Sequence, residues 1–150
     1  AGLKIEERWH HSFPSSYVKI GHDATVNWPN VDFRFSNDKD APVYLHTYRS
    51  GNRLVVELYG KADGEYDEVK LESDLYARYQ APRPTVVEDV NHKYVTYTDQ
   101  EYTKVQSRPG YKVRTYRVYY QNGREVRREQ LNDDYYQPIT GTVYVGTRQR

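Results

Sequence analysis

A chain of 150 residues without cysteine, in which 37% of the residues are hydrophobic, can form one domain or two small ones and no disulfide bond. Its net charge of +1 conceals an asymmetry: residues 1–100 carry 12 basic and 16 acidic side chains, whereas residues 101–150 carry 10 and 5. No apolar run reaches the roughly 18 residues of a membrane-spanning helix, so we expect no transmembrane segment in this chain.

Residue usage predicts the fold class. Tyrosine, with 17 residues, and the equally abundant valine favour pleated, half-buried surfaces. We therefore predict a mainly β fold of antiparallel sheets and hairpins, elongated, with little or no helix. In the first part of the chain, strands are expected within residues 3–8, 17–20, 24–26 and 31–36, and a hairpin is expected at residues 43–59 around Ser50-Gly51-Asn52.

Residues 67–80 fit two readings. Glutamate and leucine favour a helix, but Val69, Leu71, Ser73 and Leu75 repeat with the period of a strand, which we favour. The prolines of Ala81-Pro82-Arg83-Pro84 indicate a linker, so we expect one domain at residues 1–81 and a β-ribbon module at residues 82–150.

The second module is expected to be built around a hairpin. Asn122-Gly123 suits a type I′ turn, which needs positive φ at both central residues. Long strands should flank it at residues 111–120 and 125–131, and another should follow at residues 142–146. Apolar residues fall on both faces of this ribbon, mixed with arginine, so we expect it to have little core.

Residues 11–37 carry the most specific pattern in the chain. Together with Arg8 just before it, the pattern comprises His11-Ser12, Tyr17-Val18, Gly21-x-Asp23-Ala24-Thr25-Val26 and Asp32 to Asn37. This order of residues resembles the second half of a VanW domain, a family named from vancomycin-resistance clusters. The resemblance implies a bacterial cell-surface protein of Gram-positive type, extracellular and held at the wall or membrane by other sequence.

The same resemblance bears on how complete the site is. The family's upstream half ends in a glycine-rich turn that carries a cysteine at a helix start, and this chain has no cysteine and no initiator methionine. We therefore expect a C-terminal fragment of a longer protein that is not itself a competent enzyme. The tail from Pro109-Gly110 to Val145-Gly146 also resembles the glycine-containing β-ribbon repeats of surface adhesins and wall enzymes.

Some VanW domains are associated with L,D-transpeptidase chemistry on peptidoglycan, performed by the upstream cysteine. A thiol nucleophile needs a base and a group that orients the base. The resemblance implies that His11 is the base and Asp23 the orienting carboxylate, with Arg8, Ser12 and Thr25 holding the substrate. The alternative is that His11-Ser12 is a turn pair and that Asp23 closes the Gly21 turn through backbone amides.

Metal ions, cofactors and sugars are the other ligands that this region could bind. No metal site and no cofactor are expected, because the adjacent His10 and His11 would point to opposite faces of a strand. Trp9 and Trp28 could stack on sugar rings if exposed, but tryptophans of small β domains are usually buried, so we expect core positions.

The tail carries a basic stretch. Residues 108–128 contain seven basic side chains against Glu125 alone, with tyrosines between them. We expect Arg114, Arg117 and Arg127 to contact an anionic wall polymer rather than nucleic acid, since the whole chain is nearly neutral and shows no nucleic-acid-binding motif. Two functions therefore remain open: part of a peptidoglycan-acting enzyme, or a non-catalytic module that binds the cell wall.

Overall fold

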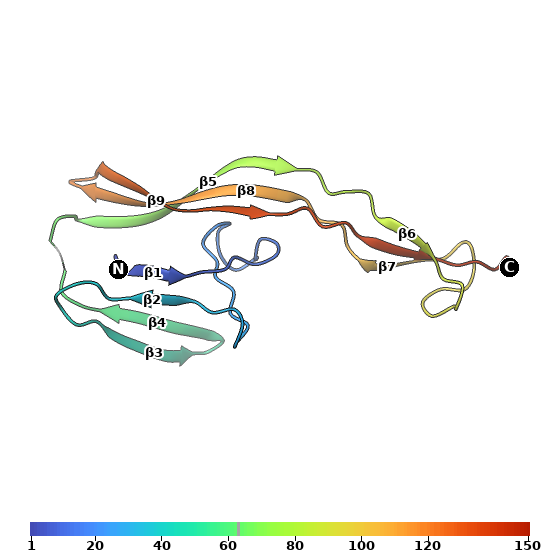
Figure 1. Cartoon of the computed structure of the whole chain (residues 1–150), viewed down its shortest axis with the longest axis horizontal. Helices are drawn as coiled ribbons and strands as arrows, with labels where there is room; N and C mark the ends of the chain where they lie inside the picture. Colours follow the sequence, from blue (N-terminus) through green and yellow to red (C-terminus); the bar gives the residue numbers. More distant parts are fainter. Residues whose placement is uncertain (63) are drawn as a thin grey trace. The chain divides into compact units, whose positions relative to one another are not determined.

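The computed structural model describes residues 1–62 and 64–150, and within these ranges it contains ten strands and no helix (Figure 1). The mainly β fold is thereby confirmed. The strands are β1 (Lys4–Glu7), β2 (Arg34–Ser36), β3 (Tyr44–Ser50), β4 (Arg53–Tyr59), β5 (Glu68–Tyr79), β6 (Thr85–Glu88), β7 (Glu101–Val105), β8 (Gly110–Gln121), β9 (Arg124–Tyr136) and β10 (Thr142–Val145).

The strands form four sheets. Two are antiparallel pairs, β1 with β2 and β3 with β4, and two are three-stranded, in the orders β5-β8-β9 and β6-β10-β7 (Figure 1). Strand β10 pairs antiparallel with β7 but parallel with β6. The sheets therefore depend on pairings between distant segments as well as on local hairpins.

The chain divides into two compact units, each described here by itself. One contains residues 1–10, 24–70 and 117–128, and the other contains residues 11–23, 71–116 and 129–150. Each unit combines several separate segments of the chain, and neither unit coincides with a predicted domain, residues 1–81 or 82–150. That split stays a prediction.

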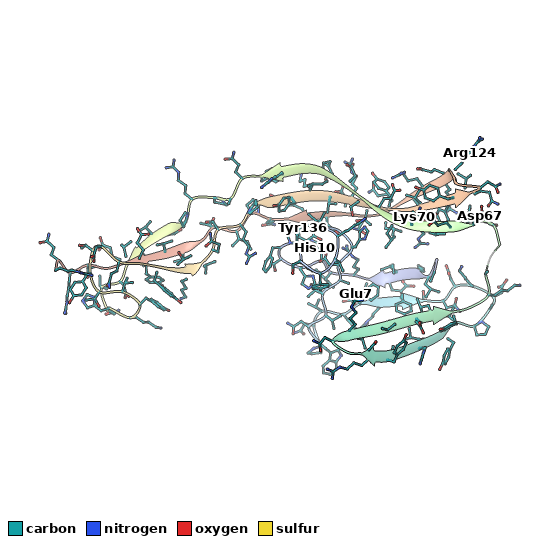
Figure 2. All side chains as sticks on the ribbon, turned by 180° about the vertical axis from the view of Figure 1, so that it is seen from behind. Glu7, His10, Asp67, Lys70, Arg124 and Tyr136 are labelled. Carbon is teal, nitrogen blue, oxygen red and sulfur yellow. The ribbon has the colours of Figure 1, made fainter. Side chains whose placement is uncertain are left out.

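The two hairpin turns that the sequence predicts at glycine residues are confirmed. Gly51, with φ of 59°, lies in the turn between β3 and β4, and Asn122 and Gly123, with φ of 51° and 71°, connect β8 to β9. The Asp67 carboxylate accepts hydrogen bonds from the Asn122 amide nitrogen and the Gln121 side chain. Figure 2 labels Asp67 and Arg124 at this hairpin end.

Residues 67–80 form a strand rather than a helix, as the period-two pattern predicts, since β5 spans nearly the whole segment. The short strands expected at residues 17–20 and 24–26 are wrong. A turn replaces the first, closed by the His22 amide donating to the Lys19 carbonyl at 3.0 Å, and residues 24–26 form no strand.

The prediction that the ribbon around the second hairpin has little core is also wrong. Strand β8 contains Val113 and Val118, both 0% exposed, together with the buried Thr115 and Tyr119. Side chains stand on the faces of a sheet, and the loop at Gly21 packs against Val113 and Thr115 on one face of the central strand β8. A pattern with apolar residues on both faces suits such a strand.

Candidate functional site

The candidate site is built on the loop of residues 11–23, which lies within one compact unit together with parts of β5, β8 and β9. Gly21 has φ of 83°, a conformation that glycine adopts without strain. Its carbonyl oxygen accepts hydrogen bonds from Thr115 Oγ1 at 3.0 Å and Asn132 Nδ2 at 3.4 Å. One residue earlier, the Ile20 carbonyl accepts from Ser73 Oγ at 2.7 Å. The three strands therefore fix the backbone of this loop.

The structure brings His11 and Asp23 together. His11 Nδ1 lies 2.8 Å from Asp23 Oδ2, and the His11 backbone amide donates to the same oxygen at 2.7 Å. The Asp23 side chain is 1% exposed, whereas the His11 side chain is 32% exposed. A buried carboxylate therefore holds one nitrogen of an imidazole that remains accessible to solvent.

A third residue completes the arrangement. The Tyr136 hydroxyl donates to Asp23 Oδ1 and accepts from the Gly21 amide nitrogen at 3.2 Å. Tyr136 ends β9 and is 0% exposed (Figure 2). Nothing in the sequence identifies Tyr136 as part of the site, because it is one tyrosine among 17 and lies 113 residues from Asp23.

The electrostatics of the pair follow from these contacts. Burial acts to raise the pKa of Asp23, but hydrogen bonds from the His11 backbone, the Tyr136 hydroxyl and the His11 ring outweigh it, so the pKa lies below its ordinary value. Burial, with the Asp23 carboxylate as partner, raises the pKa of Tyr136 above that of a free phenol. Near neutral pH, Asp23 is therefore ionised and Tyr136 is protonated.

An ionised carboxylate can only accept hydrogen bonds, so the proton between the two side chains belongs to His11 Nδ1. In a neutral ring this leaves the lone pair on Nε2. The Tyr17 hydroxyl lies 3.5 Å from His11 Nε2, with the two rings edge to face, and the Tyr17 residue is 73% exposed. The partly exposed ring can therefore accept a proton at Nε2.

The three residues predicted to hold the substrate do not all belong to the compact unit that contains His11 and Asp23. Ser12 follows His11 in an exposed bend, whereas Arg8 and Thr25 belong to the other compact unit. The Thr25 amide donates to the Trp9 carbonyl at 2.6 Å, and Thr25 Oγ1 is buried without a hydrogen-bond partner. Their assignment as substrate-binding residues stays a prediction.

The three predicted polyanion-binding arginines have partners within the chain. Arg114 lies over the Tyr76 ring and donates to Asp133 Oδ2 at 3.2 Å. Arg117 and Arg127, in the other unit, both contact Tyr119. Tyrosine side chains and, for Arg114, a carboxylate therefore order these guanidinium groups, and binding of a polymer stays a prediction.

Both tryptophans contradict the sequence prediction of core positions. Trp9 is 55% exposed and Trp28 is 77% exposed. Large apolar residues are usually buried, but these two lie outside the long strands that carry most of the buried residues. Among the residues that the structure describes, no group of three or more histidine, aspartate and glutamate side chains could hold a metal ion.

Comparison with known proteins confirms the recognised pattern. Residues 1–59 match the family model described as VanW like protein, and residues 82–148 match that of the G5 domain. The uncharacterized protein YoaR of Bacillus subtilis (strain 168) is 41% identical over 59 residues, which are 39% of this chain and 20% of that protein. The chain thus spans about a fifth of the length of this relative.

Among solved structures, the chain is similar to an IgA1 protease G5 domain, with a TM-score of 0.34 and 19% identity over 55% of this chain and 93% of that one. By the two family matches, the chain contains a VanW-like segment at residues 1–59, followed by a G5-like segment at residues 82–148. In the part of the chain that the structure describes, no helix is long and apolar enough to cross a membrane.

Proposed function

We propose that this chain supplies the general base of a cysteine enzyme that acts on peptidoglycan stem peptides by L,D-transpeptidase-like acyl transfer. His11 accepts the proton of the thiol, and Asp23 orients the imidazole. Because the chain contains no cysteine, the thiol belongs to a residue outside these 150 residues. Arg8, Ser12 and Thr25 are proposed to contact the substrate.

A single observation carries this proposal. The 2.8 Å contact between His11 Nδ1 and the buried Asp23 Oδ2 leaves the lone pair on Nε2 of an imidazole whose side chain is 32% exposed. A base that is oriented by a third group and can reach a nucleophile is the arrangement that thiol activation needs. A carboxylate that only closed the Gly21 turn would not need an accessible imidazole as a partner.

The proposed reaction has two steps. In the first, His11 Nε2 takes the thiol proton, the thiolate sulfur attacks the carbonyl carbon of the donor stem peptide, and a thioester forms. The donor's amide bond breaks, and the leaving amine takes the proton from His11. In the second step, the amine of an acceptor stem attacks the thioester carbonyl and passes a proton to His11. The carbon–sulfur bond breaks, a new amide forms, and the leaving thiolate takes the proton back from His11. The ionised Asp23 stabilises the imidazolium in both steps.

The test is the turnover of a longer form of the protein that carries a cysteine, with His11→Ala compared with His10→Ala. General-base help contributes about 10²- to 10⁴-fold to a rate, so His11→Ala should reduce turnover on that scale. The neighbouring His10→Ala is the matched control and should retain most of the activity. Full turnover by His11→Ala would reject the proposal.

A second, non-catalytic function is supported by the charge of the tail. Residues 108–128 carry an excess of six positive charges, and aromatic rings hold several of these side chains in place. We propose that Arg114, Arg117 and Arg127 contact an anionic polymer of the wall. The wall would then be the binding partner whether or not the longer protein is an enzyme.

A further inference from the structure

We propose that Tyr136 is a positioning residue for the pair of His11 and Asp23, so that the final residue of β9 completes a site whose other members lie in the VanW-like segment. The catalytic meaning of this inference rests on the proposed function. Its structural content does not, because it concerns how one buried carboxylate is held in this chain.

The Tyr136 hydroxyl has a fixed direction. Its oxygen accepts from the Gly21 amide at 3.2 Å, and its proton goes to Asp23 Oδ1. A hydroxyl has one proton to donate, so accepting from Gly21 orients that proton towards the carboxylate. The two oxygens of Asp23 are thereby divided, with Oδ1 facing Tyr136 and Oδ2 facing the backbone and ring of His11.

This division matters because the carboxylate is almost completely buried, with 1% of its side chain exposed. A buried charge needs donors, and losing one disfavours the ionised form. If Oδ1 lost the hydrogen bond from the Tyr136 hydroxyl, the Asp23 carboxylate would take up a proton more readily or rotate towards other donors. Either change would weaken the hydrogen bond between His11 Nδ1 and Asp23, so the neutral ring would no longer prefer to carry its proton on Nδ1.

The support for the loop also comes from outside the VanW-like segment. Residues 1–59 match the VanW family model, whereas Ser73, Thr115, Asn132 and Tyr136, which bond to residues 20–23, all lie beyond it. Three of these four lie within residues 82–148, which match the G5 domain. The inferred unit of function is therefore the loop of residues 11–23 together with β5, β8 and β9.

Tyr136→Phe in the 150-residue chain tests the inference, because it keeps the ring and removes only the hydroxyl. Tyr135→Phe is the matched control: this neighbour is 40% exposed and its ring lies 5.6 Å from that of Tyr79. The readouts are the titration of the Asp23 carboxyl carbon by ¹³C NMR and the distribution of the proton over the His11 ring by ¹⁵N NMR.

We expect Tyr136→Phe to raise the pKa of Asp23 and to shift the neutral His11 ring towards the form protonated at Nε2. Tyr135→Phe should change neither. A folded Tyr136→Phe protein in which both signals match the wild type would overturn the inference. If Tyr136→Phe does not fold, the wild-type protein decides: a slowly exchanging Tyr136 hydroxyl proton close to the Gly21 amide supports the inference, and a freely exchanging one refutes it.

These outcomes separate the inference from the proposed function. If the NMR signals respond to Tyr136→Phe but His11→Ala keeps full turnover in the longer protein, only the catalytic proposal fails. If His11→Ala loses turnover but the signals ignore Tyr136→Phe, only the positioning role of Tyr136 fails.

Discussion

Replacing Gly21 with alanine should destabilise the loop that carries His11 and Asp23 for two separate reasons. At φ of 83° an L-residue is strained, which costs about 1–2 kcal/mol. A Cβ at this position would also lie within 3.3 Å of the Val113 methyl groups and closer still to Thr115 Oγ1. Thr115 must then move and give up its hydrogen bond to the Gly21 carbonyl, a loss of about 1 kcal/mol. The expected total is about 2–3 kcal/mol in the free energy of unfolding.

Gly51→Ala provides the control for this prediction. Gly51 also has positive φ, 59°, but a Cβ there would meet nothing within 4 Å, so only the backbone strain applies. Urea unfolding followed by circular dichroism should show a larger loss for Gly21→Ala than for Gly51→Ala, by about 1 kcal/mol or more. Equal losses in the two variants would refute the claim that β8 clamps the loop at Gly21.

Three further predictions follow from charges and turns. Asp89, which follows β6, accepts hydrogen bonds from the backbone amides of Lys93, Tyr94 and Val95. Burial acts to raise the pKa of Asp23 and of Asp89, but hydrogen bonds outweigh it and lower both pKa values. Their contribution to the free energy of unfolding should therefore be complete above about pH 4 and be lost as the pH drops through the lowered pKa values, and an acid titration of unfolding without this fall would contradict it. Gly123→Ala, at φ of 71°, should cost about 1–2 kcal/mol in urea unfolding, and no loss would contradict the turn assignment. Binding to purified cell walls should weaken with added salt and with Arg114→Ala combined with Arg117→Ala, and binding that ignores both changes would reject the polyanion proposal.

Local features of the fold could be predicted from the sequence. Asn122-Gly123 and Ser50-Gly51-Asn52 specify turns through their own backbone preferences, and the alternation from Val69 to Leu75 identifies β5. Residues 17–26 form a loop rather than the predicted strands. Brief apolar runs fit either a strand or a loop, and the hydrogen bonds that hold this loop come from β5, β8 and β9.

Distant pairings could not be predicted in this way. The parallel pairing of β10 with β6 joins segments more than 50 residues apart, and nothing in either strand specifies the other. The burial of Val113 and Thr115 in β8 depends on the loop at Gly21 packing against them, and the sequence of the β8–β9 hairpin alone does not indicate that contact.

The same distinction between local and distant residues applies to the candidate site. His11 and Asp23 were found through the family resemblance, since they lie only 12 residues apart within one recognisable pattern. Tyr136 lies in a strand of ordinary composition, and its partner becomes visible only when the loop is placed on the sheet.

The central claim is that Asp23 holds a proton on His11 Nδ1, so that the lone pair of the neutral ring lies on Nε2 and can act as a base. The most direct measurement is a long-range ¹H–¹⁵N correlation spectrum of the 150-residue chain, with Asp23→Asn beside the wild type. We predict that the neutral His11 ring of the wild type carries its proton on Nδ1, and that this preference is lost in Asp23→Asn. A wild-type ring protonated at Nε2, unchanged by the substitution, would contradict the account.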